Sequence, residues 1–113
     1  TYGPWRSFGQ TFRASYVAVT TIAPGKPILI GEMASSEAGG NKAAWIRDMF
    51  KELPGMPAIR ALTWFDIVKE TSWNVDSSDE SWLAMIEGLR APWVRSSGAA
   101  MASVAARKPA KPD

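Results

Sequence analysis

The chain has 113 residues, a formal net charge of +2 and neither cysteine nor histidine. These absences exclude disulfides, zinc sites built from cysteine or histidine, and any Ser-His-Asp or Cys-His catalytic arrangement within this chain. Acid–base chemistry must therefore fall to Asp, Glu, Lys or Tyr. Residues 90–113 carry five of the 13 basic groups and one of the 11 acidic groups, so the basic balance is local and gives no reason to expect a nucleic-acid partner. No apolar run approaches the roughly 20 residues that a membrane span needs.

The first half of the chain predicts a helix followed by a strand. Phe8, Phe12 and Tyr16 recur at four-residue spacing within residues 5–22, which is the pattern of a helix with one aromatic face. A Pro-Gly pair ends this helix. The apolar run over residues 27–31 then predicts a strand, and its continuous Ile and Leu content is typical of a strand buried on both faces of a parallel sheet.

The second half predicts a helix, a strand and a further helix. An apolar stripe and a candidate N-cap at Asn41 predict a helix over residues 41–53, which prolines stop. Residues 58–65 predict a second strand, and a long loop follows it. Apolar positions at helical spacing predict the last helix over residues 79–89, with acidic residues near its N-terminus, as the helix dipole favours.

Strands that alternate with helices predict βαβ units, a parallel sheet and the α/β fold class. Two strands cannot make a stable sheet with both edges open, and a (β/α)8 barrel needs eight strands and about 250 residues. The chain also begins at Thr1, without a Met or a signal-peptide pattern. We therefore expect a missing N-terminal part of the same barrel. Residues 1–93 are predicted to be the C-terminal part of that barrel, and residues 94–113 an Ala-, Ser-, Lys- and Pro-rich disordered tail.

Candidate catalytic residues lie where the two predicted strands end. Glu32 follows the first strand at once, Trp64 and Asp66 end the second, and Trp73 lies in the loop that follows. The carboxyl ends of parallel strands are where barrel enzymes keep their catalytic groups, so we expect these side chains to converge. Indole rings stack on sugar rings, and a carboxylate can attack an anomeric carbon, so the pattern indicates a carbohydrate site. The acidic residues over 76–80 lack calcium-loop spacing, and no metal site is expected.

Two stretches of the sequence resemble a known family. The segments KPILIGEMASSEAGGNKAAWIRDMF and PAIRALTWFDIVKETSWNVDSS are similar to the C-terminal quarter of family 26 glycoside hydrolases, the β-mannanase group, and to related members of the larger clan of barrel glycosidases. The upstream segment PWRSFGQTFRASYVAV fits the helix before the seventh strand. The resemblance covers roughly residues 4–89 and implies that this chain is the last two βα units, strands 7 and 8, of a (β/α)8 TIM barrel.

The resemblance also implies a role for each candidate residue. Glu32 falls on the nucleophile, Trp64 on a sugar platform, and Trp73 on a tryptophan that lines the cleft. The acid/base glutamate of the family ends the fourth strand, which this chain does not contain. Asp66 departs from the family, which often has Asn there, and adds a negative charge near the sugar contacts.

The implied activity is that of a retaining glycoside hydrolase that needs no cofactor. Its partner would be a β-linked polysaccharide, with β-1,4-mannan as the default and β-glucan or xylan as alternatives. The resemblance suggests a secreted or periplasmic protein. This chain alone should be inactive, because one carboxylate cannot act as both nucleophile and acid. Two other interpretations stay open: a carbohydrate-binding or assembly protein on a degenerate barrel, and an unrelated α/β domain in which Glu32 forms a structural ion pair.

Overall fold

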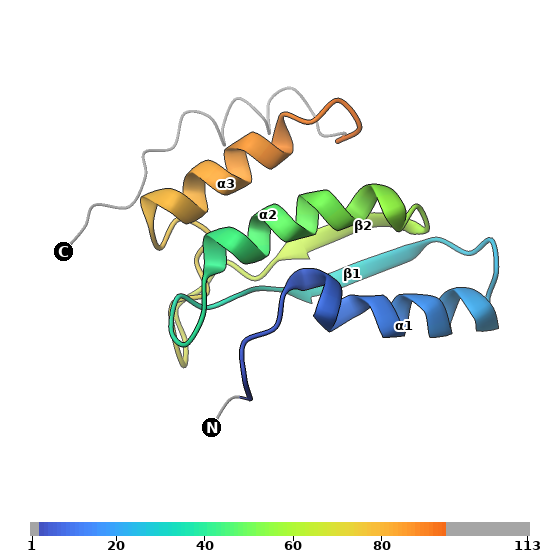
Figure 1. Cartoon of the computed structure of the whole chain (residues 1–113), viewed down its shortest axis with the longest axis horizontal. Helices are drawn as coiled ribbons and strands as arrows, with labels where there is room; N and C mark the ends of the chain where they lie inside the picture. Colours follow the sequence, from blue (N-terminus) through green and yellow to red (C-terminus); the bar gives the residue numbers. More distant parts are fainter. Residues whose placement is uncertain (1–2, 95–113) are drawn as a thin grey trace.

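The computed structural model describes residues 3–94, so the predicted tail lies, except for residue 94, outside the described residues. The chain folds into helices and strands that alternate as predicted (Figure 1). In order these are α1 (Phe8–Ile22), β1 (Ile28–Met33), α2 (Lys42–Glu52), the 3-10 helix η1 (Leu53–Gly55), β2 (Ile59–Trp64) and α3 (Asp79–Leu89).

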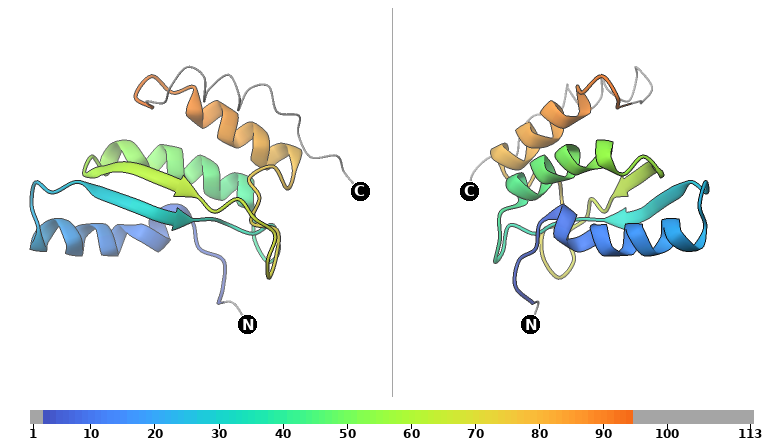
Figure 2. Two further views of the ribbon diagram at one scale, coloured as in Figure 1. Left: turned by 180° about the vertical axis from the view of Figure 1, so that it is seen from behind. Right: turned by 45° about the vertical axis from the view of Figure 1, so that its right-hand side comes forward.

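The strands β1 and β2 pair in parallel, which confirms the prediction, and α2 connects them. Helices α1 and α2 lie against one face of this sheet, and α3 lies along α2 on the side away from α1 (Figures 1 and 2). The other face is open within the described residues, and Leu29 on β1 is 69% exposed. Burial of the strands on both faces was expected of a sheet completed by further strands, and it stays a prediction.

Each of the three α-helices begins at a side chain that satisfies free backbone N–H groups. Helix α1 starts three residues later than predicted, because Ser7 and Gln10 form a capping box: each side chain accepts a hydrogen bond from the other residue's backbone N–H. Asn41 caps α2, as predicted, and Ser78 caps α3. The caps of α2 and α3 thus set where the loops that follow β1 and β2 end.

Strand β1 carries a β-bulge at its carboxyl end. The sequence predicted that Glu32 comes just after this strand. In the structure the strand continues to Met33, so Glu32 lies within it. The pairing passes from Ile30 opposite Leu62 to Met33 opposite Trp64, which is three steps on β1 against two on β2. The extra residue lets Ile30 and Met33 both face the core although they are three apart. Bulges redirect side chains, and this one leaves Glu32 on the exposed side of the strand.

The core lies between the helices and the sheet and is centred on Trp45 of α2, which is 4% exposed. Its ring packs edge-on against Phe8 of α1, with centroids 5.3 Å apart, and against Trp64 of β2, with centroids 5.8 Å apart. One aromatic cluster therefore joins both layers. Burial of each such side chain contributes about 1.5–3 kcal/mol, so these contacts help to attach α1 and α2 to the sheet.

A large apolar groove of about 960 Å³ runs beside β2. Its walls come from β2, α2 and α3 and include Ile59, Leu62, Phe50 and Leu89. In the described residues nothing pairs with the outer edge of β2, because the sheet has two strands and β1 takes the other edge. The groove and the free strand edge together leave apolar surface that a second chain segment could cover.

We expect the isolated 113-residue chain to self-associate. Free strand edges pair with other chains, and exposed apolar patches drive association. Sedimentation velocity at rising protein concentration should show growing oligomers, and the chain should bind the dye ANS. A chain that stays monomeric, ignores ANS and unfolds in one sharp thermal transition would contradict this expectation.

Candidate functional site

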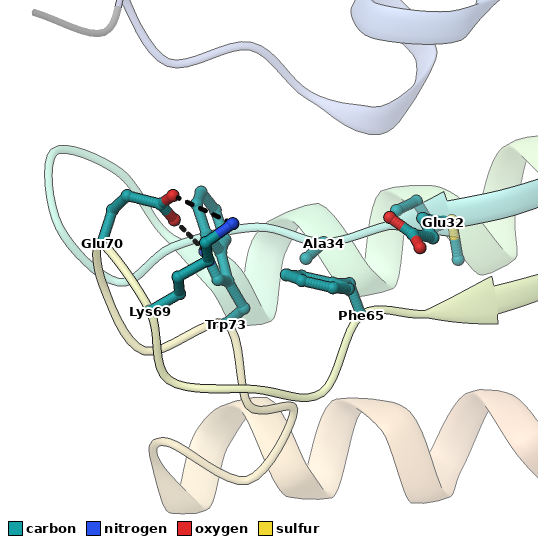
Figure 3. Close-up of a pocket in the computed structure, with 7 residues that line it drawn as sticks. Glu32, Ala34, Phe65, Lys69, Glu70 and Trp73 are labelled. Carbon is teal, nitrogen blue, oxygen red and sulfur yellow. Dashed lines mark hydrogen bonds and ion pairs between the residues drawn. The ribbon is translucent and has the colours of Figure 1, made fainter.

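A pocket of about 310 Å³ lies at the carboxyl ends of β1 and β2 (Figure 3). Three elements line it: the end of β1, the residue after β2, and the loop between β2 and α3. The lining residues are Glu32, Met33, Ala34, Phe65, Lys69, Glu70 and Trp73. In Figure 3 the Phe65 ring lies between Trp73 and Glu32. Two carboxylates and two aromatic rings therefore share one pocket, and Phe65 was not among the predicted site residues.

Glu32 is exposed on β1 at the mouth of this pocket. Within residues 3–94 no hydrogen bond or ion pair to its carboxylate is found. A structural carboxylate at a strand end ordinarily has a cationic partner or a backbone donor. Within the described residues the Glu32 carboxylate is therefore unengaged.

Trp73 is half-buried, and its ring forms one wall of the pocket. Its Nε1–H donates to Glu70 Oε2 at 3.2 Å, and the Glu70 carboxylate also lies 3.8 Å from Lys69 Nζ. A hydrogen bond from its own backbone N–H, together with the bond from Trp73, lowers the pKa of the Glu70 carboxyl. Glu70 therefore favours the ionised, hydrogen-bond-accepting form and is poorly suited to donate a proton.

Trp64 lies at the same end of the sheet as Glu32 but does not line the pocket. Its ring packs on Trp45 in the core, and its Nε1–H donates to Trp73 O at 2.7 Å. The structure therefore brings Glu32 and Trp73 together and places Trp64 behind them. The sugar-platform role of Trp64 stays a prediction.

Asp66 also lies outside the lining of the pocket. Its Oδ1 accepts a hydrogen bond from the backbone N–H of Val75 at 2.8 Å, across the base of the loop between β2 and α3. The side-chain oxygen of Asn could accept the same bond. A direct contact between Asp66 and sugar stays a prediction.

A buried lysine next to the site was not predicted. Lys42 has no exposed surface, and its Nζ lies within hydrogen-bond distance of three oxygens. These are Ser72 O at 3.1 Å, Asn74 O at 2.7 Å and Ser77 Oγ at 2.6 Å. A signal for it exists in the sequence, because Lys42 lies four residues before Ile46 and seven before Met49, on the buried stripe of α2.

Glu37, in the loop after β1, links two loops near the site. Its Oε1 accepts hydrogen bonds from the hydroxyls of Ser77, Ser78 and Ser81 around the N-terminus of α3. Burial alone raises the pKa of Glu37, but the three hydroxyl donors and the charge of Lys42 outweigh it and lower the pKa below its ordinary value. The ionised carboxylate is thus the form that holds the loops together.

This lowered pKa predicts how stability depends on pH. The contribution of Glu37 is present above its ordinary pKa of about 4.5 and is lost as the pH falls through the lower folded value. In a carbon-13 titration at concentrations where the chain is monomeric, the Glu37 carboxyl should titrate below 4.5. Ser81→Ala should raise the midpoint, and Ser15→Ala, an exposed serine of α1, should not. A wild-type midpoint at or above the ordinary value would refute this assignment.

Across residues 3–94 no helix has the length and apolar character to cross a bilayer. The same residues contain no group of three or more acidic side chains that could hold a metal ion.

No family model matches the chain. The chain is 41% identical over 88 residues to endoglucanase H of Acetivibrio thermocellus. The chain is thus related to a glycosidase. The match covers 77% of this chain and 10% of the relative, so the chain spans about a tenth of that protein's length. The predicted relationship to glycosidases is confirmed in this general form.

Proposed function

We propose that this chain is the last two βα units of a (β/α)8-barrel glycoside hydrolase, similar to family 26, that acts on a β-linked polysaccharide. One observation carries the proposal: Glu32 has no partner within the described residues and lies beside Phe65 and Trp73 in a pocket at the carboxyl ends of two parallel strands. This is the end of a barrel at which catalytic groups are found. The 41% identity to an endoglucanase independently supports the glycoside hydrolase part of this proposal.

In the proposed mechanism Glu32 is the nucleophile of a retaining reaction. Its carboxylate attacks the anomeric carbon, the glycosidic C–O bond breaks, and a glycosyl ester forms. A second carboxylic acid protonates the leaving oxygen and then activates the water that hydrolyses the ester. Glu70 does not suit that role, because its lowered pKa favours the anion. We propose that the acid/base residue comes from strands that precede this segment, with the two carboxyl groups about 5–5.5 Å apart.

The aromatic walls of the pocket support a sugar as the ligand. Phe65 and Trp73 present rings that can stack on the apolar face of a pyranose. The name of the relative points to β-glucan, and the family 26 resemblance points to β-1,4-mannan. Stacking contacts alone do not distinguish the two polymers, so both are substrates to test.

Glu32→Ala in the full-length protein should lower turnover by several orders of magnitude, because removal of a covalent nucleophile has effects on this scale. Activity on β-glucan and β-mannan should be measured together with circular dichroism. Glu87→Ala, which changes a largely exposed glutamate of α3, is the matched control and should stay near wild type. Azide should restore turnover of an activated aryl glycoside by Glu32→Ala and give the product of inverted configuration.

Two results would count against this proposal. Near-normal activity of Glu32→Ala would remove Glu32 from the chemistry. A wild-type protein that binds these polysaccharides without hydrolysing them would favour a carbohydrate-binding protein on a degenerate barrel.

Trp73→Ala should weaken binding of oligosaccharides by about 1–3 kcal/mol, if stacking on sugar resembles the stacking of bases on aromatic side chains. Isothermal titration calorimetry of the full-length protein with Glu32 mutated would measure this without turnover. Trp93→Ala is the control, because Trp93 is 45% exposed and packs on Phe50 away from the pocket. Equal affinities of Trp73→Ala and Trp93→Ala would exclude Trp73 as a sugar contact.

A further inference from the structure

We propose that Lys42 is a positioning residue that holds Trp73 in place for sugar binding. This inference rests on the proposed function, because it assigns Lys42 a task at the same site. Lys42 does not line the pocket, so we assign it no contact with the sugar. It acts through the backbone of the loop that carries Trp73.

Three consecutive carbonyl groups around Trp73 accept hydrogen bonds from side chains outside the loop. Lys42 Nζ donates to Ser72 O and Asn74 O, at 3.1 and 2.7 Å, on either side of Trp73. Trp64 Nε1 donates to the carbonyl of Trp73 itself at 2.7 Å. We call these three bonds the loop clamp. It fixes the backbone from which the Trp73 ring projects into the pocket.

Lys42 is buried, so its ammonium group forms its hydrogen bonds with the protein instead of with water. Lys42 has no exposed surface, and its third donor reaches Ser77 Oγ at 2.6 Å, so the three acceptors match the three N–H groups of an ammonium. Burial lowers the pKa of Lys42, and the negative charge of Glu37 opposes this. A lysine on the buried stripe of a helix is costly unless all its donors are used. An apolar residue there would leave the loop carbonyls without these donors.

The loop between β2 and α3 has little regular structure of its own. Among the described residues its one strand-like pairing is the isolated bridge between Val68 and Ser72. The ring of Trp73 is held at its tip by Glu70, and the backbone behind it by the loop clamp. Without Lys42 we expect the backbone of residues 72–74 to loosen, and with it the ring, while Glu32 on β1 keeps its position.

The test compares Lys42→Met with Lys51→Met in the full-length protein. Lys51 is exposed on the same helix and is the matched control. In Lys42→Met the KM for a β-linked polysaccharide should rise about tenfold or more, the scale of lost hydrogen bonds to a charged group. Turnover of a small activated aryl glycoside should stay within about twofold, because it needs Glu32 but little stacking. Amide hydrogen exchange over residues 72–75 should become faster in Lys42→Met alone.

A double-mutant cycle separates positioning from general destabilisation. If Lys42 acts through Trp73, then Lys42→Met should add little to the KM of Trp73→Ala, so the two effects are not additive. Additive effects on KM would overturn the proposal, as would unchanged exchange over residues 72–75. Ser77→Ala removes one of the three acceptors of Lys42 and should change KM and exchange in the same direction by less. If Lys42→Met does not fold, the outcome with Ser77→Ala decides.

Failure of the proposed function gives a different pattern. If the wild-type protein hydrolyses neither β-glucan nor β-mannan, the glycosidase assignment fails. The loop clamp is then tested by amide hydrogen exchange alone. Faster exchange over residues 72–75 in Lys42→Met, with no change in Lys51→Met, then still supports the clamp. Unchanged exchange in both overturns it.

Discussion

Parallel pairing of β1 with β2 is the constraint on which the site depends. Because the strands run in the same direction, their carboxyl ends lie at the same end of the sheet, where the loops meet. The β-bulge at the end of β1 then keeps Met33 in the core and leaves Glu32 exposed. A regular strand would alternate sides from Ile30, and could not bury both Ile30 and Met33. The position of the carboxylate thus follows from one extra residue in one strand.

At the carboxyl ends of the strands, polar side chains hold the loops together. Glu37 joins the loop after β1 to the N-terminus of α3, and Lys42 joins the start of α2 to the loop that carries Trp73. Both groups are fixed by several hydrogen bonds, whereas Glu32 has none in the described residues. Preorganised catalysis requires a carboxylate that packing and hydrogen bonds hold in place, so in the proposed barrel the groups that hold Glu32 would come from other strands. In the described residues the groove beside β2 and the free strand edges stay uncovered, and in the proposed barrel the remaining strands would cover them.

Local patterns predicted much of this architecture. The spacing of Phe8 and Phe12 predicted α1, and the position of Asn41 predicted the start of α2, because periodicity and capping act over a few residues. The sequence also placed Glu32 and Trp73 at one site. It could not show the bulge, which depends on how two distant segments pair. Nor could it separate Trp64 from Phe65, because the packing of Trp64 on Trp45 in the core leaves Phe65 as the ring that turns toward the pocket.

Glu32 is proposed to form the covalent bond to the sugar. The most direct measurement is to trap that bond in the full-length protein with an activated 2-deoxy-2-fluoro glycoside, digest the product and locate the label by mass spectrometry. A fluorine at C2 slows hydrolysis of a glycosyl ester, so a retaining enzyme accumulates it. We expect the added sugar on the peptide that contains Glu32. A label on another carboxylate, or full activity with no label at all, would contradict the account.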